Sequence, residues 1–180
     1  MSVSGLACVT GRFQPVHEDH LRLFRMGLRD HGALIVGITN PDPSGRRAEP
    51  TSAHRHREDA NPFTYWERAT LVRAAVEHDP RVLVVPFDLG RPELWECFAP
   101  LEAVQYVGRG GEWEAEKARR LRGAGYAVIE VDPGPGARRA ATAIRAAIRD
   151  GGRWEALVPP ATVPLLEAFI RRRRERGVPL

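Results

Sequence analysis

Two histidines, His17 and His20, stand close together near the N-terminus, within residues 11–20 (GRFQPVHEDH). An apolar run at residues 6–10 precedes this stretch, and apolar residues at helical spacing follow it from Leu21 onward. The histidines are therefore expected at a turn from a strand into a helix, where backbone N–H groups and the helix dipole favour phosphate. Two imidazoles at such a turn can hydrogen-bond a triphosphate, so the sequence predicts phosphate chemistry in its first βα unit. The alternative is a pair of surface histidines at a helix start.

The elements that must position this turn are predicted from apolar runs and helical periodicity. Strands are expected at residues 6–10, 33–38, 81–86, 103–107 and 126–131, and helices at residues 64–78, 92–98, 112–122, 140–150, 153–157 and 163–174. Strands that alternate with helices form parallel βαβ units, so we expect an α/β fold with a doubly wound, five-stranded parallel sheet and a C-terminal helical extension over about residues 138–176. Ligands of such sheets bind beyond the C-terminal ends of the strands, where the histidines lie.

Length and composition indicate a single domain over residues 1–180, with the charged and apolar fractions of an ordinary soluble protein. No apolar run is long enough to span a bilayer, and the N-terminus lacks a signal-peptide layout. Cys8 and Cys97 lie in apolar surroundings and are expected to be buried free thiols in a reducing cytoplasm. The formal charge of +4 suits anionic ligands, and 26 of the 27 basic residues are arginine, with Lys117 as the one lysine.

Residues 40–61 form a polar stretch without periodicity, rich in proline, serine, arginine and histidine. The stretch is too long for an ordinary connection in a compact domain, so it is expected to be a lid-like insertion. Arg55 and Arg57 in its second half are candidates for contact with the nucleotide phosphates.

The pattern GRFQP followed by H-x-x-H resembles the HxGH signature of the nucleotidyltransferase superfamily, and in its full length that of the archaeal-type nicotinamide mononucleotide adenylyltransferases. This resemblance implies a Rossmann-like sheet. It also implies that His17 and His20 are catalytic and that the nucleotide-binding residues include Gly11, Arg12, Phe13 and Gln14. The signature glycine is replaced by Asp19, which leaves the choice of base open.

The segment at residues 61–68 looks like the NPFTxxER segment of the same family. Thr64 and Glu67 have the spacing of a capping box, which by itself explains the segment as a helix start. Arg68 is interpreted as a structural ion-pair partner in preference to a ligand.

The resemblance also identifies candidates for binding the acceptor. In the family, an Asp precedes by this spacing a Trp that stacks on the nicotinamide ring, and here these residues are Asp88 and Trp95. The equal alternative for Trp95 is a core aromatic residue. The usual loop after the fourth strand is replaced by residues 108–111 (GRGG), and Arg109 in this loop is a candidate for binding a small anionic acceptor.

Residues 140–145 (AATAIR) are similar to the family's S-x-T-x-[IV]-R motif, in which the arginine reaches the β- and γ-phosphates from a helix start. Arg145 and Thr142 are present and are predicted to bind the triphosphate, with Arg145 counted as catalytic. Arginine suits this role because its fork of donors can hold phosphate oxygens bidentately. Ala140 replaces the serine, and the alternative for Arg145 is an ordinary surface arginine.

The predicted function is nucleotidyl transfer from a nucleoside triphosphate to a phosphate or phosphonate, with release of pyrophosphate. ATP with nicotinamide mononucleotide is the first expectation, and a CTP-dependent enzyme that activates a small phosphonate such as phosphonoformate is the alternative. Mg²⁺ is expected as cofactor on the phosphate oxygens, without dedicated protein ligands.

The expected partners are these two small molecules, without nucleic acid or membrane, in a cytoplasmic protein that could be a homo-oligomer. The sequence disfavours two further classes of function. A nucleotide-sensing module without turnover is disfavoured because both histidines and Arg145 are present. Nucleic-acid binding through the arginine run at residues 171–174 is disfavoured because such a run usually is a solvated helix end.

Overall fold

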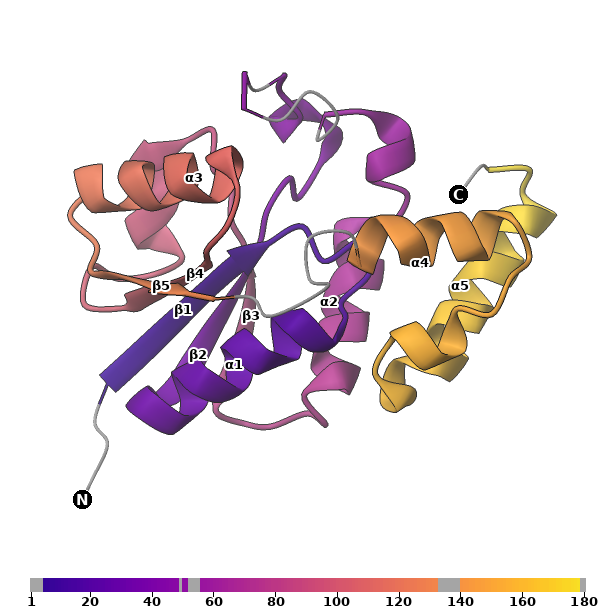
Figure 1. Cartoon of the computed structure of the whole chain (residues 1–180), viewed down its shortest axis with the longest axis horizontal. Coiled ribbons are helices and arrows are strands. Elements are labelled where there is room, and N and C mark those ends of the chain that lie inside the picture. The colour runs from indigo at the N-terminus through magenta and orange to yellow at the C-terminus, as the bar shows by residue number, and fades with distance from the viewer. Residues whose placement is uncertain (1–4, 49, 52–55, 133–139, 179–180) are drawn as a thin grey trace.

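The structure is a computed structural model that describes residues 5–48, 50–51, 56–132 and 140–178. Five strands form one parallel sheet in the order β3-β2-β1-β4-β5 (Figure 1). The strands are β1 (Gly5–Gly11), β2 (Gly32–Ile38), β3 (Val82–Pro86), β4 (Val104–Gly108) and β5 (Val128–Val131). The strand order reverses at β1, since β2 and β3 lie on one side of it and β4 and β5 on the other.

The central strands are apolar on both faces because helices cover both faces of the sheet. Helices α1 (Glu18–His31) and α2 (Tyr65–Ala75) cover one face, whereas α3 (Glu112–Gly123) and the 3₁₀ helix η3 (Pro92–Cys97) cover the other (Figure 1). Two hydrophobic clusters result. The α1 cluster includes Val9, Phe13, Phe24 and Ile144, and the α3 cluster includes Cys8, Trp95, Val107, Trp113 and Leu121.

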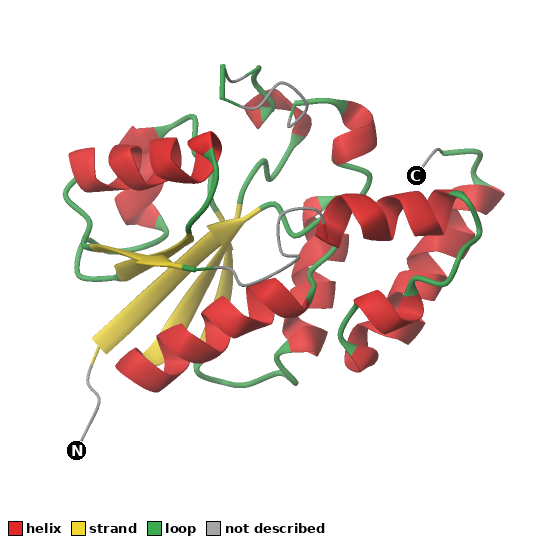
Figure 2. Ribbon diagram, viewed as in Figure 1, coloured by secondary structure: helices red, strands yellow, loops and turns green. Residues whose placement is uncertain are grey.

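The C-terminal extension consists of α4 (Ala140–Arg149), the 3₁₀ turns η5 (Glu155–Leu157) and η6 (Pro160–Thr162), and α5 (Val163–Glu175), and it packs beside α2 (Figure 2). Part of the arginine run belongs to this packing. Arg173 lies 3.4 Å from the carboxylate of Glu67 and over the ring of Phe63, and Arg174 donates to the carbonyl of Ile148. These two arginines therefore stabilise the extension.

The predicted α/β fold and its five-stranded parallel sheet are confirmed, with shifts at element ends. The helix expected at residues 64–78 ends at Ala75 because Glu77 and His78 take left-handed φ angles of 52° and 56°. The last strand starts at Val128, since Tyr126 packs in the α3 cluster and donates to the carbonyl of Ala99 instead of pairing in the sheet.

The predictions for the cysteines and for the insertion agree with the structure only in part. Cys8 is buried as predicted, but the prediction for Cys97 is wrong because this residue is exposed at the end of η3. The described part of the insertion contains the 3₁₀ turns η1 (Pro43–Gly45) and η2 (Glu58–Ala60), and its closure over a nucleotide stays a prediction. Within the described residues, none of the helices is both long and apolar enough to cross a bilayer.

Candidate active site

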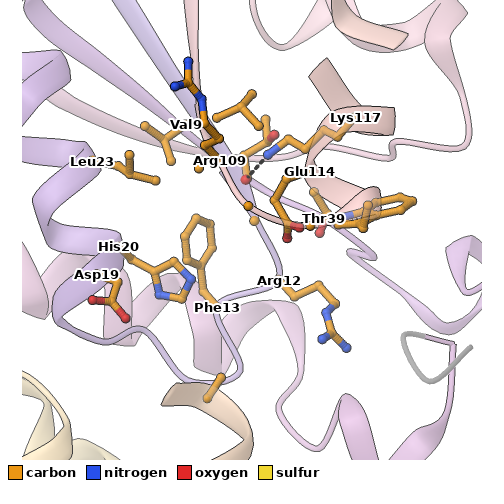
Figure 3. Close-up of a pocket in the computed structure, with 18 of the residues that line it drawn as sticks. Val9, Arg12, Phe13, Asp19, His20, Leu23, Thr39, Arg109, Glu114 and Lys117 are labelled. Atoms are coloured by element: carbon orange, nitrogen blue, oxygen red, sulfur yellow. Dashed lines mark hydrogen bonds between the residues drawn. The ribbon is translucent and has the colours of Figure 1, made fainter. Parts of the chain in front are cut away.

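A cavity of about 480 Å³ opens where β1 ends, at the point where the strand order reverses. Its wall combines the turn into α1, the loop between β4 and α3, and the start of α4 (Figure 3). Such a position is the usual ligand site of a doubly wound sheet. The wall holds most of the predicted site residues: Gly11, Arg12, Phe13, Gln14, His17, His20, Arg109, Thr142 and Arg145.

The turn after β1 is shaped by Phe13, which is buried and has a positive φ of 50°. The Phe13 ring lies edge-on to His20, with 4.8 Å between ring centroids. A side chain on Gly11 would approach this ring to 2.9 Å, so the position requires glycine. Gly11 thus leaves room for the Phe13 ring, and that ring packs against His20 in the cavity wall.

Gln14 has a structural role that the sequence did not indicate. Its amide nitrogen donates to the carbonyl of Phe63 at 3.0 Å, and its amide oxygen accepts from the N–H of Phe63 at 2.9 Å. With both ends of its buried amide used, Gln14 fixes the turn to the segment before α2. Its backbone carbonyl accepts from Arg145.

The rings of the two histidines lie against each other at the N-terminus of α1, with 3.8 Å between their centroids and an angle of 39° between their planes. His17 is the residue before the helix, and its backbone N–H donates to Nδ1 of His20 at 3.2 Å. A neutral His20 therefore carries its proton on Nε2, where it can donate to a ligand. His17 and His20 thus lie within the first turn of α1, at the strand-to-helix turn that the sequence predicts.

Both imidazoles are neutral at neutral pH. Burial lowers the pKa of His17 to about 4. Burial, then the charge that His17 would carry if it were protonated as well, and then the positive charges of Lys117 and Arg12, hold the pKa of His20 well below its usual range. The site accordingly offers uncharged donors to a phosphate at this turn.

Asp19, which replaces the signature glycine, lies in the first turn of α1 and lines the cavity. One carboxylate oxygen is 3.4 Å from Nδ1 of His17. Partial burial raises the pKa of Asp19, while Arg22 opposes this shift. Asp19 thus adds a carboxyl group to a cavity wall that also includes Glu112, Glu114 and Asp132.

Arg145 and Thr142 reach the same cavity from α4 as the sequence motif predicts. Arg145 is 8% exposed, and it donates to the carbonyl of Gln14 at 2.8 Å and to the hydroxyl of Thr142 at 3.3 Å. Burial lowers its pKa, yet an arginine stays charged. These contacts hold the guanidinium beside the histidine turn, 131 residues away in the chain.

The remaining nucleotide-binding candidates are placed differently. Arg12 lines the cavity and donates to the carbonyl of Ala60, which links it to the end of the insertion. Arg57 is not part of the cavity wall, and its exposed guanidinium lies 3.3 Å from Asp59. Arg55 lies outside the described residues.

One of the three candidates for binding the acceptor lies in the cavity wall, and the other two lie outside it. Arg109 lines the cavity from the loop after β4. Trp95 is 1% exposed, stacks on Phe87 and donates through its indole nitrogen to the carbonyl of Asp88 at 2.8 Å. The Asp88 carboxylate accepts from the N–H of Gly90, and neither Asp88 nor Trp95 is part of the cavity wall. The structure therefore places Trp95 as a core aromatic residue, the second of the two interpretations.

Arg68 is structural, but its partners differ from the expected carboxylate. Its buried guanidinium donates to the backbone carbonyls of Arg12, Thr39, Asn40 and Thr64, at 2.7 to 3.2 Å. Arg68 thereby joins the ends of β1 and β2 to the start of α2.

Lys117 and Trp113 of α3 also line the cavity, although no sequence motif includes either residue. Lys117 is 8% exposed, and its ammonium donates to the carbonyl of Thr10 at 2.5 Å (Figure 3). Trp113 is 9% exposed, with the guanidinium of Arg120 over its ring. A lone lysine among 26 arginines was the one signal in the sequence.

Known proteins resemble this chain at the level of sequence and of fold. Residues 8–137 match the model of a family described as cytidylyltransferase-like. A phosphonoformate cytidylyltransferase of Streptomyces viridochromogenes is 33% identical, over 92% of this chain and 92% of that protein. A nicotinamide-nucleotide adenylyltransferase of Ignicoccus hospitalis is 30% identical, over 94% of this chain and 96% of that protein.

Among solved structures, a bifunctional NMN adenylyltransferase/ADP ribose pyrophosphatase from Francisella tularensis has a TM-score of 0.68 at 16% identity. The match covers 96% of this chain and 50% of that longer protein. A putative nicotinate-nucleotide adenylyltransferase from Vibrio parahaemolyticus has a TM-score of 0.58 at 15% identity, over 91% of this chain. At these sequence identities, the two structures indicate a shared fold and nothing more specific.

Proposed function

Because the chain belongs to the cytidylyltransferase-like family and is a nucleotidyltransferase, we propose that it transfers the cytidylyl group of CTP to a small phosphonate such as phosphonoformate. The family match and the two relatives confirm the family resemblance and the nucleotidyl transfer predicted from the sequence. What we propose is the pair of substrates. CTP with a small phosphonate, the alternative in the sequence analysis, is now preferred to ATP with nicotinamide mononucleotide, the first expectation.

The burial of Trp95 carries this choice. A nicotinamide ring needs an accessible aromatic face, and the indole expected to supply it is 1% exposed and stacked on Phe87. The cavity wall formed by the β4–α3 loop and α3 instead holds Arg109 and Lys117, together with Glu112, Glu114 and Asp132. The two cationic residues there suit a compact, highly charged acceptor.

In the reaction, a phosphonate oxygen attacks the α-phosphorus of the triphosphate, and the bond from that phosphorus to the pyrophosphate oxygen breaks. The phosphonate is already an anion at neutral pH, so its oxygen needs no general base. The protein then acts by positioning and by stabilising the charge that develops. Neutral His17 and His20 would donate to oxygens around the α-phosphorus, while Arg145 and Arg12 would hold the β- and γ-phosphates.

Magnesium would accompany the triphosphate. Among the described residues, no three His, Cys, Asp or Glu side chains are grouped so that they could hold a metal ion. Mg²⁺ that is bound mainly by phosphate oxygens and water, a common arrangement at nucleotide sites, needs no such group of side chains. When bound, the ion would neutralise part of the triphosphate charge. We also propose a cytoplasmic location, because the described cysteines are both free.

A pyrophosphate-release screen tests the proposal directly. Each of the four ribonucleoside triphosphates is combined with phosphonoformate, with methylphosphonate and with nicotinamide mononucleotide, and the His20→Ala variant serves as the background control. CTP with phosphonoformate should give the highest kcat/KM. Turnover confined to ATP with nicotinamide mononucleotide would reject it.

Nicotinamide mononucleotide with ATP remains the second candidate because one aromatic residue, Trp113, does line the cavity. If this candidate is right, Trp113→Leu should raise the KM for nicotinamide mononucleotide by about 5- to 30-fold, the equivalent of ~1–2 kcal/mol of ring stacking. The same variant should leave the KM for phosphonoformate within about twofold.

A further inference from the structure

One face of α1 forms a side of the cavity beyond the histidine turn. Asp19, Arg22 and Leu23 line the cavity there, and residues three and four positions apart in a helix lie on the same face. Figure 3 shows Asp19, His20 and Leu23 together on one side of the cavity, across from Lys117. This face of α1 presents a carboxylate, a guanidinium and an apolar side chain to a ligand.

The carboxylate of Asp19 can be reached from the cavity. Its side chain is 32% exposed, and one oxygen lies 3.4 Å from Nδ1 of His17. Partial burial raises the pKa of Asp19, and the positive charge of the nearby Arg22 opposes this shift. Leu23 is partly buried against the α1 cluster, and the part of it that lines the cavity offers an apolar contact beside the two charges.

The geometry of the proposed reaction indicates which part of the nucleotide lies against this face. The α-phosphate would lie at His17 and His20, and the β- and γ-phosphates toward α4 and Arg12. The attacking and the leaving oxygen are roughly in line at the phosphorus, so the acceptor comes from the opposite side, toward the β4–α3 loop. The nucleoside must therefore leave the α-phosphorus in a third direction. Asp19 lies in the same first turn as the histidines, so the face of α1 is the adjoining wall in that direction.

The chemistry of this face matches a cytosine base. Cytosine has an amino group at C4 that donates, a carbonyl oxygen at C2 that accepts, and a flat ring. A carboxylate can accept from the amino group, an arginine can donate to the carbonyl oxygen, and an apolar side chain can pack on the ring. Uracil has a carbonyl oxygen at C4, so a carboxylate would face it acceptor to acceptor.

From this arrangement we propose that Asp19 selects the base of the nucleotide by accepting a hydrogen bond from the 4-amino group of cytosine. Arg22 donates to the oxygen at C2, which cytosine and uracil share, and Leu23 packs against the ring. This inference rests on the proposed function. The glycine of the family signature has no side chain, so the selection depends on the presence of Asp19 at this position.

Equilibrium binding tests the inference without any acceptor. Isothermal titration calorimetry gives the Kd of CTP, dCTP and UTP with Mg²⁺ for the wild type, Asp19→Asn and Asp19→Ala. The matched control is Glu18→Gln, because Glu18 is also an acidic residue in the first turn of α1 but is 68% exposed, pairs with Arg25 and is not part of the cavity wall. Thermal unfolding of each variant shows whether the fold is intact.

The ratio of the two dissociation constants isolates the base from the phosphates, since a change of charge near the triphosphate affects CTP and UTP alike. The wild type and Glu18→Gln should bind CTP at least about tenfold more tightly than UTP. An asparagine both donates and accepts, so Asp19→Asn should bring the two Kd values to within about threefold of each other. Asp19→Asn should also bind UTP about threefold or more tightly than Asp19→Ala, which has no donor for the oxygen at C4.

Two outcomes would overturn the inference. An unchanged ratio of CTP to UTP in Asp19→Asn would show that the carboxylate does not contact the base. Loss of a preference for CTP over dCTP, with the CTP to UTP ratio retained, would place Asp19 on the ribose 2′-hydroxyl instead.

Failure of the proposed function has a different signature. Wild-type protein that binds ATP at least about tenfold more tightly than CTP would reject the choice of CTP. The same variants are then compared with ATP and inosine triphosphate, whose base has an oxygen in place of the amino group of adenine. A ratio of these two that Asp19→Asn lowers would support Asp19 as the residue that selects an amino group, and an unchanged ratio would reject the inference as well.

Discussion

Replacement of Trp95 by phenylalanine separates a core role from an acceptor-binding role for this residue. The indole nitrogen donates to the carbonyl of Asp88 at 2.8 Å, and the ring stacks on Phe87 at a centroid distance of 5.6 Å. Phenylalanine keeps the stacking but leaves the carbonyl without its donor, which costs about 1–3 kcal/mol, and the smaller ring leaves a void that costs about 1 kcal/mol. The free energy of unfolding should therefore fall by about 2–4 kcal/mol.

For a domain of this length the expected decrease in Tm is about 5–15 °C. The assay combines thermal unfolding with acceptor kinetics at a temperature where the variant is folded. Trp95→Phe should leave the KM for phosphonoformate and for nicotinamide mononucleotide within about twofold of wild type. Arg109→Ala should raise the KM for phosphonoformate by about tenfold or more, as for the loss of a charge-assisted hydrogen bond. The control, Arg91→Ala, removes an arginine that lies outside the cavity wall and pairs with Glu93 at 3.1 Å.

The opposite pattern would refute this reasoning. If Trp95→Phe keeps the wild-type Tm and raises the KM for nicotinamide mononucleotide, the ring contacts the acceptor and not the core. The phosphonate proposal would then lose the observation that carries it.

Three further predictions concern the histidine turn and the triphosphate contacts. His17→Ala and His20→Ala should each lower kcat by two or more decades with smaller effects on KM, since donors aimed at developing charge are worth about 2.7–4 kcal/mol each. The control is His78→Ala. Near-wild-type turnover in His17→Ala or His20→Ala would exclude the turn as the catalytic centre. Arg145→Lys should lower kcat/KM for the triphosphate by about 10- to 100-fold despite its retained charge, because the bidentate fork is lost; an unchanged value would show that only charge matters there. The pKa of His17 is about 4 in the folded protein, whereas an unperturbed histidine has a pKa of 6.5. As the pH falls, His17 is therefore protonated in the unfolded chain before it is protonated in the folded protein. The free energy of unfolding consequently decreases below about pH 6.5. From pH 7 to pH 5 this residue should account for about 2 kcal/mol of lost unfolding free energy, and urea titrations of His17→Gln should show a loss smaller by that amount.

The sequence predicted best where local chain geometry decides the outcome. The strand, turn and helix around His17 and His20 follow from one contiguous stretch, and the capping box of Thr64 and Glu67 forms as its spacing indicates. Arg145, which a family motif and not its local surroundings singled out, lies in the cavity wall, and its contact with the triphosphate stays a prediction.

Contacts between distant segments could not be predicted from spacing. Lys117 meets the carbonyl of Thr10 across 107 residues, and the amide of Gln14 meets Phe63 across 49 residues. The burial of Trp95 depends on Phe87 and Tyr126, which reach it from other elements. Whether a polar or aromatic side chain faces a ligand or its own backbone is decided by such tertiary contacts, and no local pattern carries that information.

The two hydrophobic clusters on opposite faces of the sheet have a consequence for how such an enzyme can change. Phe13, Phe24 and Ile144 support the histidine turn and α4 from one cluster, whereas Trp113 and Leu121 support the cavity wall at α3 from the other. Substitutions that are distant and share no partners have nearly additive effects. Lys117 is the exception, because its ammonium contacts Thr10 and lowers the pKa of His20. Mutations on the α3 face away from Lys117 can therefore accumulate with little effect on the histidine turn, and a laboratory search for new acceptor specificities should randomise those positions first.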